Sequence, residues 1–124
     1  MSETNVTVVP DGTRVLPRRP RKEPGRSIIY LGQLYRWKGV DTLVQAMRDV
    51  PNATLAIVGT GEIREGRDVD RRRLEELVQS LALQQRISFE PFVPYDQVPE
   101  RLEQADVATV PLPDVLMSRY FTSP

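Results

Sequence analysis

The segment from Gly32 to Gly39 concentrates residue types that could bind a phosphate. It carries two cations, Arg36 and Lys38, and it lies between a short apolar run and a helical pattern. In open parallel α/β sheets, ligands bind at the carboxyl ends of the strands, where the loops lead into helix N-termini with free backbone amides. The loop therefore fits a phosphate or pyrophosphate. A second interpretation stays open, in which Gly32 only makes a turn, Lys38 is solvated and Trp37 covers the edge of the core.

A glycine pair, Gly59 and Gly61, follows another apolar run. The dinucleotide fingerprint needs G-x-G-x-x-G directly after a strand, and here Arg64 stands where the third glycine belongs. The phosphate-loop pattern that ends in Gly-Lys-Ser/Thr is absent as well. Two glycines still let a ligand come close to the backbone, but a plain loop at the end of a strand explains them more simply.

The acidic residues do not single out a general base, so the catalytic residues stay unassigned. Asp41 and Glu62 lie nearest the two loops, whereas Glu90, Asp96 and Asp106 are expected to cap helices or to face solvent.

Three consecutive arginines at residues 71–73 resemble a nucleic-acid patch. Acidic residues flank them on both sides, at Asp68, Asp70, Glu75 and Glu76. This pattern predicts a solvated helix face with ion pairs between successive turns.

The composition excludes whole classes of chemistry. The 124 residues contain no Cys and no His, which rules out a disulfide framework, a thiolate nucleophile, a Cys/His zinc site and any triad that needs an imidazole. Lys and Arg number 17 and so do Asp and Glu, and this balance argues against a dedicated nucleic-acid binder. We expect no transmembrane segment, because no apolar run reaches about 18 residues. The start of the chain has no signal-peptide pattern, so we expect a cytoplasmic protein.

Short apolar runs alternate with helical patterns in the second part of the chain. The strand candidates lie at 28–31, 55–58, 86–89 and 107–110. Apolar spacing of i, i+3, i+4 and i+7 predicts helices over 40–47 and 74–81, and a shorter helix over 98–105 has Asp96 as its candidate N-cap. This alternation predicts an α/β fold with a parallel sheet and helices on both faces.

The two ends of the chain differ from this regular part. A strand candidate at Val6–Val9 is followed at 11–26 by a proline-rich stretch with six basic and two acidic residues. We therefore divide the chain into 1–26, which includes a basic linker, and a domain over 27–124. The segment Leu112–Phe121 predicts no regular element, yet it is apolar enough to pack on something. Because four strands leave one sheet edge uncovered, we expect the chain to stop before its domain does.

Five segments together resemble the C-terminal, donor-binding domain of GT-B glycosyltransferases of family 4 (glycosyl transferases group 1). Asn5–Gly12 resembles the "v-x-V-i-P-n-G" strand and turn that ends the family's N-terminal domain. Tyr30–Ala46 resembles "G-R-L…K-G-x-x-x-L-i-x-A" and Leu55–Gly61 resembles "L-x-i-v-G-x-G". Arg86–Val93 resembles "r-V-x-F-x-G-x-V" and Ala105–Pro111 resembles "A-D-v-x-v-x-P". The five segments occur in the right order and at the right spacing.

The resemblance implies a Rossmann-like domain of which about four of six strands are present. The activity it implies is transfer of a sugar from a nucleotide-sugar donor, with retention of configuration, without a metal and without a cofactor other than the donor substrate. It also implies partners outside this chain, namely an N-terminal acceptor domain and a Glu-bearing helix with two further strands. We therefore expect a donor-binding half that does not turn over by itself.

The resemblance assigns the donor's diphosphate to the first loop. Lys38 matches the family's phosphate-binding lysine, and the companion arginine of the family falls at Gln33. Arg36 is the candidate substitute for that arginine, and Gly32 and Gly39 bound the same loop.

Two further segments are implied in donor binding. Gly59 and Gly61 would let the backbone approach the donor, and backbone groups near Phe92 and Val93 would hold the nucleobase. Pro91 replaces the family's glycine in that turn.

Two alternatives remain. The first is a non-catalytic Rossmann-like module that binds a partner chain or itself through the apolar tail from Leu112 to Phe121 and an exposed strand edge. The second, less favoured, is a nucleic-acid binder that uses the basic linker.

Overall fold

Four parallel strands form the central sheet of the molecule. The computed structural model describes Thr7, Val9, residues 12–17, Pro20 and residues 23–120. The strands lie in the order β5-β2-β1-β6. Their bounds are Ser27–Leu31 (β1), Thr54–Val58 (β2), Ile87–Glu90 (β5) and Val107–Thr109 (β6). Ile28 of β1 pairs with Leu55 on one side and Val107 on the other, so its strand is central. The predicted fold class is confirmed.

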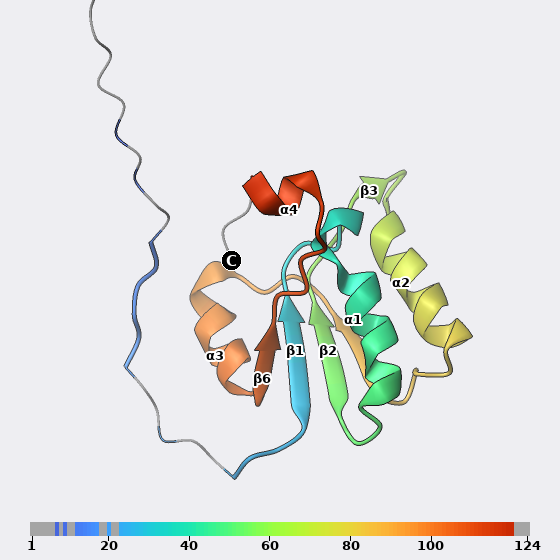
Figure 1. Cartoon of the computed structure of the whole chain (residues 1–124), viewed down its shortest axis with the longest axis horizontal. Coiled ribbons are helices and arrows are strands. Elements are labelled where there is room, and N and C mark those ends of the chain that lie inside the picture. Colours follow the sequence, from blue (N-terminus) through green and yellow to red (C-terminus); the bar gives the residue numbers. More distant parts are fainter. Residues whose placement is uncertain (1–6, 8, 10–11, 18–19, 21–22, 121–124) are drawn as a thin grey trace, which may run out of the picture.

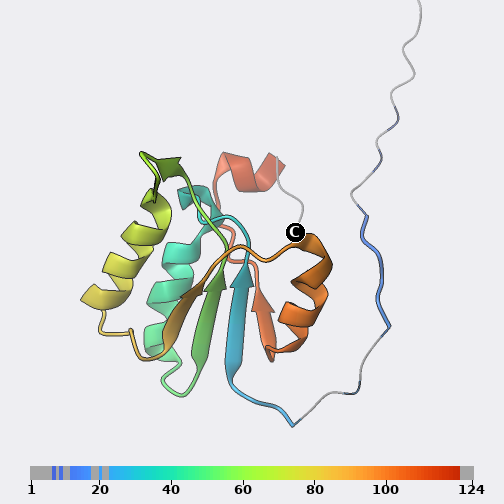
Figure 2. The ribbon, with the colours of Figure 1, turned by 180° about the vertical axis from the view of Figure 1, so that it is seen from behind.

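Helices cover both faces of the sheet (Figure 1). α1 (Val40–Ala46) and α2 (Val69–Ser80) lie side by side on one face, and α3 (Val98–Glu103) lies on the other, as the view from behind confirms (Figure 2). Three 3₁₀ turns flank these helices: η1 (Arg36–Lys38), η2 (Met47–Asp49) and η3 (Tyr95–Gln97). None of the helices in the described part of the chain has the length and hydropathy that a membrane crossing requires.

The hydrophobic core fills the space between the sheet and the two helices α1 and α2. Strand side chains alternate between the two faces, and Tyr30 and Ile57, which are in register on β1 and β2, contribute to this core. Val44 from α1 and Leu74 from α2 meet them and are fully buried. Leu34, in the loop between β1 and α1, is 1% exposed. The core therefore anchors the loop that carries the predicted phosphate ligands.

The helices start where the sequence predicts or earlier. α2 begins five residues before the predicted start, because the carboxylate of Asp68 accepts the Arg71 N–H (2.9 Å) and caps the helix. α3 begins at Val98 and has a proline in its first turn, as expected. The N-cap expected at Asp96 is wrong, since Asp96 lies inside η3 and the N-cap residue, Gln97, makes no side-chain cap bond.

A hairpin that the sequence did not predict precedes α2. It pairs β3 (Ile63–Arg64) with β4 (Arg67–Asp68) in antiparallel fashion. Glu65 and Gly66 at its tip have φ values of +49° and +73°. Positive φ at both central residues is the geometry of the two-residue hairpin turn of type I′.

The segment after β6 contains a short helix, α4 (Leu116–Tyr120). The expectation of no regular element after Pro111 is therefore wrong for the described residues of that segment. α4 contacts η1 above the carboxyl edge of the sheet (Figure 1). A helix this short is unstable alone and depends on tertiary contacts such as this one. For that reason the local sequence pattern does not predict it.

Asp106 ties the start of the domain to the sheet. Its carboxylate accepts the N–H groups of Gly25 (2.8 Å) and Ser27 (2.9 Å) and the Ser27 hydroxyl (2.7 Å). It therefore neither caps a helix nor simply faces solvent, which corrects the expectation. Val6 and Val8 of the predicted first strand lie outside the described residues, and Thr7 and Val9 belong to no strand.

Candidate functional site

The loops after β1, β2 and β5 meet at the carboxyl edge of the sheet. The Gly32 N–H donates to the Val58 carbonyl (3.0 Å), and the Gly59 N–H donates to the Glu90 carbonyl (3.2 Å). Gly59 has a φ of +142°, and a Cβ at this position would lie 1.9 Å from the Gly32 carbonyl oxygen. The structure thus brings two of the predicted site glycines together and explains why a side chain is excluded at Gly59.

Gly39 closes the first loop against the segment that follows β6. Its φ is +76°, and a Cβ there would lie 1.8 Å from the carbonyl oxygen of Pro111. The loops after the two neighbouring strands β1 and β6 are therefore in direct contact at this glycine.

The two predicted cations lie on η1 within this loop. Arg36 is exposed and Lys38 is half-buried, and neither forms an ion pair with any residue that the structure describes. The Lys38 Nζ lies 4.1 Å from the centroid of the Trp37 ring, which stacks on Tyr35 at a centroid distance of 6.5 Å. Both positive charges thus remain available to an anion.

Tyr30 fixes the backbone at the start of the loop. Its hydroxyl donates to the Gln33 carbonyl (2.5 Å), while the Gln33 side chain is exposed. Burial raises the pKa of Tyr30 to about 12. The hydroxyl therefore stays protonated and keeps its hydrogen bond at neutral pH.

A cavity of about 530 Å³ opens beside η1, within the usual size range of small-molecule sites. Of the predicted site residues, Arg36 lines it, whereas Gln33, Lys38, the glycines and Phe92 and Val93 do not. The full lining is Tyr35, Arg36, Trp37, Glu62, Arg64, Val69, Asp70 and Arg73.

Two carboxylates hold the loop after β2. The Gly61 N–H donates to Asp68 and the Glu62 N–H donates to Asp70, both at 2.8 Å. A Cβ on Gly61 would lie 2.4 Å from the Asp70 Cβ, so packing inside the protein accounts for the glycine. These two amides are engaged, and the neighbouring negative charges disfavour a phosphate here. An anion is better placed at Arg36 and Lys38.

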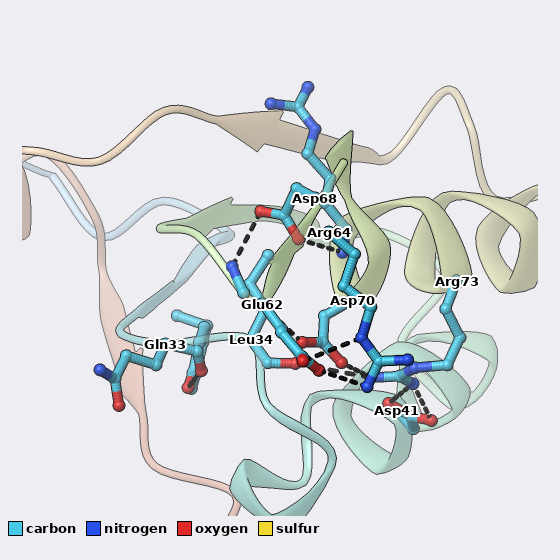
Figure 3. Close-up of polar contacts among 11 residues, drawn as sticks. Gln33, Leu34, Asp41, Glu62, Arg64, Asp68, Asp70 and Arg73 are labelled. Carbon is cyan, nitrogen blue, oxygen red and sulfur yellow. Dashed lines mark hydrogen bonds and ion pairs between the residues drawn. The ribbon is translucent and has the colours of Figure 1, made fainter. Parts of the chain in front are cut away.

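Arg73 connects this loop to the loop after β1 (Figure 3). Its guanidinium reaches both carboxylate oxygens of Asp41 at the start of α1 (2.5 Å), Asp70 (3.3 Å) and the Leu34 carbonyl (3.5 Å). The Arg73 side chain is 19% exposed. Burial lowers the pKa of Arg73, but the hydrogen bonds and charges of Asp41 and then Asp70 outweigh burial and raise it. The guanidinium therefore stays charged, and its two terminal nitrogens are hydrogen-bonded.

Sequence reasoning placed Arg73 on a solvated face, which is wrong. The prediction is confirmed for its two neighbours, since Arg71 pairs with Glu75 (2.8 Å) and Arg72 with Glu76 (3.3 Å) at the surface. The helical periodicity could have indicated that Arg73 is partly buried, because it lies one turn before Leu77, on the side of α2 that faces the core.

The predicted nucleobase residues follow β5, next to the glycine loop of β2. Phe92 is 68% exposed and Val93 is half-buried. Their strand is joined to Gly59 through the Glu90 carbonyl, so they lie at the same edge of the sheet as the loop after β1.

These features define an open parallel α/β domain whose first strand is followed by two cations without ion-pair partners in the part of the chain that the structure describes. The family model for glycosyl transferases group 1 matches residues 14–113. The chain therefore belongs to the glycosyl transferases group 1 family, and the expected membership of the GT-B glycosyltransferases is confirmed.

Two relatives agree with this assignment. An uncharacterised glycosyltransferase of Methanocaldococcus jannaschii is 30% identical over 89 residues, which cover 69% of this chain and 21% of the relative. The solved structure of sucrose-phosphate synthase from Thermosynechococcus elongatus matches with a TM-score of 0.63 and 32% identity, over 71% of this chain and 22% of that one. The chain thus spans about a fifth of the length of either relative.

Proposed function

We propose that this chain binds the diphosphate of a nucleotide-sugar donor for glycosyl transfer. The observation that carries the proposal is the pair of cations on η1, Arg36 and Lys38, which lack ion-pair partners among the described residues and lie at the carboxyl edge of the sheet. Gln33, whose amide faces solvent, and the backbone of Gly32 and Gly39 complete the proposed diphosphate loop.

The proposed chemistry follows from charge. When the glycosidic bond to the donor phosphate breaks, negative charge grows on the departing nucleoside diphosphate, and fixed cations stabilise that charge in the transition state. Arg36 and Lys38 supply two positive charges for this task without a metal ion. We include retention of configuration in the proposal because the family resemblance implies it. It does not rest on any residue identified in this chain.

The rest of the donor would lie along the same edge. We place the nucleobase against the backbone at Phe92 and Val93, which adjoins the loop of Gly59. Approach of the donor to the backbone at Gly59 and Gly61 is part of the proposal through the family resemblance, since contacts inside the protein already account for both glycines.

We further propose that the 124 residues bind a donor but do not transfer sugar alone. The relatives are longer than this chain, since the matched segments cover only 21% and 22% of their lengths. An N-terminal acceptor domain is the partner that the proposal requires, and a cytoplasmic location remains a prediction.

Titration calorimetry of the chain with UDP, GDP and ADP tests the proposal. At least one nucleoside diphosphate should bind, and Lys38→Ala should weaken binding about tenfold, as expected for one charge-assisted contact. Arg48→Ala is the matched control, because Arg48 is exposed on η2 at the far end of α1. A folded chain that binds none of the three nucleotides would contradict the proposal.

A second candidate function, an interaction module, is favoured by the exposed apolar residues near β6 and α4. Val110 is 65%, Leu116 67% and Tyr120 72% exposed. Self-association through the surface formed by these residues would bury them. Sedimentation velocity over a range of concentrations should then reveal a dimer that Leu116→Lys dissociates, and a monomer at every concentration would count against it.

A further inference from the structure

We propose that Arg73 is a positioning residue for the donor site, which fixes the loop after β1 relative to the loop after β2. The inference rests on the proposed function, because the loop after β1 carries the proposed diphosphate ligands. Arg73 itself lines the cavity beside η1 but is not assigned a contact with the donor.

Arg73 is hydrogen-bonded on one side to the loop after β1, which carries Arg36 and Lys38. The guanidinium donates to the Leu34 carbonyl (3.5 Å), two residues before Arg36, and to the carboxylate of Asp41, three residues after Lys38. Both ends of the loop segment that bears the two cations are thus bound to one side chain of α2 (Figure 3).

Arg73 is linked on the other side to the loop after β2, which contains Gly59 and Gly61. Asp70 accepts a hydrogen bond from the guanidinium (3.3 Å) and, through its other oxygen, one from the Glu62 N–H (2.8 Å). Asp70 is 10% exposed, so water competes little with these bonds. A displacement of either loop would break a bond to this shared ion cluster.

One nitrogen of the Arg73 guanidinium makes no hydrogen bond to the described residues, which a purely stabilising role does not explain. Its Nε is buried and has no hydrogen-bond partner among the described residues. A buried donor without a partner costs free energy, and such groups call for an explanation beyond stability. The guanidinium instead directs its two terminal nitrogens at three acceptors on different segments. Lysine has one nitrogen and could not span them.

The chain provides a matched control one residue away. Arg72 is also on α2, but it pairs with Glu76 on the same helix and is 66% exposed. Arg72→Met removes the same charge and leaves both loops untouched, while Arg73→Met keeps the length of the aliphatic stem and removes the linkage.

The first measurement is amide hydrogen exchange of the full chain without nucleotide. Arg73→Met should raise exchange at least about threefold in residues 33–38 and 60–62 while the strands β1 and β2 stay as protected as in the wild type. Arg72→Met should change neither. Arg73→Lys, which keeps a charge near Asp41, should give intermediate exchange and serves if Arg73→Met does not fold. Unchanged exchange, or a uniform rise over the whole domain, would overturn the proposal.

The second measurement is the dissociation constant of the tightest of UDP, GDP and ADP, taken well below the unfolding temperature of every variant. Arg73→Met should raise it about tenfold and Arg72→Met should leave it unchanged. Loosened loops with a wild-type dissociation constant would overturn the positioning role. If the wild-type chain binds no nucleotide, the proposed function fails, and the exchange result alone then supports or overturns the linkage of the two loops.

Discussion

Glu90, at the end of β5, forms a two-pronged ion pair with Arg101 of α3. The Arg101 Nε and Nη2 lie 2.8 Å and 2.7 Å from the two carboxylate oxygens, and the two side chains are 35% and 18% exposed. The same glutamate accepts the Gly59 N–H through its carbonyl. The pair therefore joins the helix on one face of the sheet to the strand end beside the site, which corrects the expectation that Glu90 caps a helix or faces solvent.

The Glu90 pair makes a prediction for acid stability. The hydrogen bond from Arg101 lowers the pKa of Glu90, against a smaller opposing effect of burial. Because the folded pKa is depressed, the stabilisation is present above the unfolded pKa, about 4.3, and is lost as the pH falls through the folded pKa. Glu90→Gln should cost about 1 kcal/mol near pH 7 and progressively less in more acidic solution. Urea unfolding across this pH range measures it, and a difference that stays constant with pH would contradict it.

Tyr30 makes a prediction at the alkaline end. Its pKa is raised to about 12, so the protonated form is favoured in the folded state. The stabilisation is present below the unfolded pKa, about 10, and is lost as the pH rises through the folded value. Of the four tyrosines, one should ionise late when absorbance near 295 nm is followed, and Tyr30→Phe should remove that late phase. A late phase that persists in the variant would assign it to another tyrosine.

Gly39 and Gly66 separate the two reasons for which a glycine is required. Both have positive φ, but a Cβ on Gly66 would meet nothing within 4 Å, whereas one on Gly39 would overlap the Pro111 carbonyl. Gly66→Ala should cost about 1 kcal/mol for the backbone conformation alone. Gly39→Ala should cost clearly more, because the segment after β6 must move. Equal losses in thermal unfolding would mean that the Pro111 contact contributes little.

Trp37 offers a direct optical test of ligand placement. It is the single tryptophan, it lines the cavity beside η1, and Lys38 lies over its ring. A nucleoside diphosphate bound by Lys38 would draw the ammonium group toward the phosphates, so the tryptophan emission should change with the same dissociation constant that calorimetry gives. Emission that is constant at saturating nucleotide would place the ligand away from this loop.

The order and type of the main elements followed from local signals. Apolar runs without alternation marked the buried parallel strands, and the helical spacing at 40–47 marked the first helix. Each of these patterns reflects a face of the strand or helix that must be buried, so it can be recognised within a single segment of the sequence. The two-residue strands of the hairpin before α2 and the five-residue helix α4 show no such pattern, and the sequence does not predict them.

The amino-acid sequence is sufficient to predict an α/β domain with two cations after its first strand, and to exclude chemistry based on His or Cys. Which charges lack an ion-pair partner among the described residues depends on the tertiary packing. Three successive arginines have identical local chemistry, yet two pair along the surface of α2 and Arg73 turns inward to Asp41, 32 residues earlier in the chain. A guanidinium forms hydrogen bonds with whichever acceptors lie within about 3 Å. The packing of α1 against α2 decides which acceptors these are, and it cannot be inferred from the sequence of either helix alone.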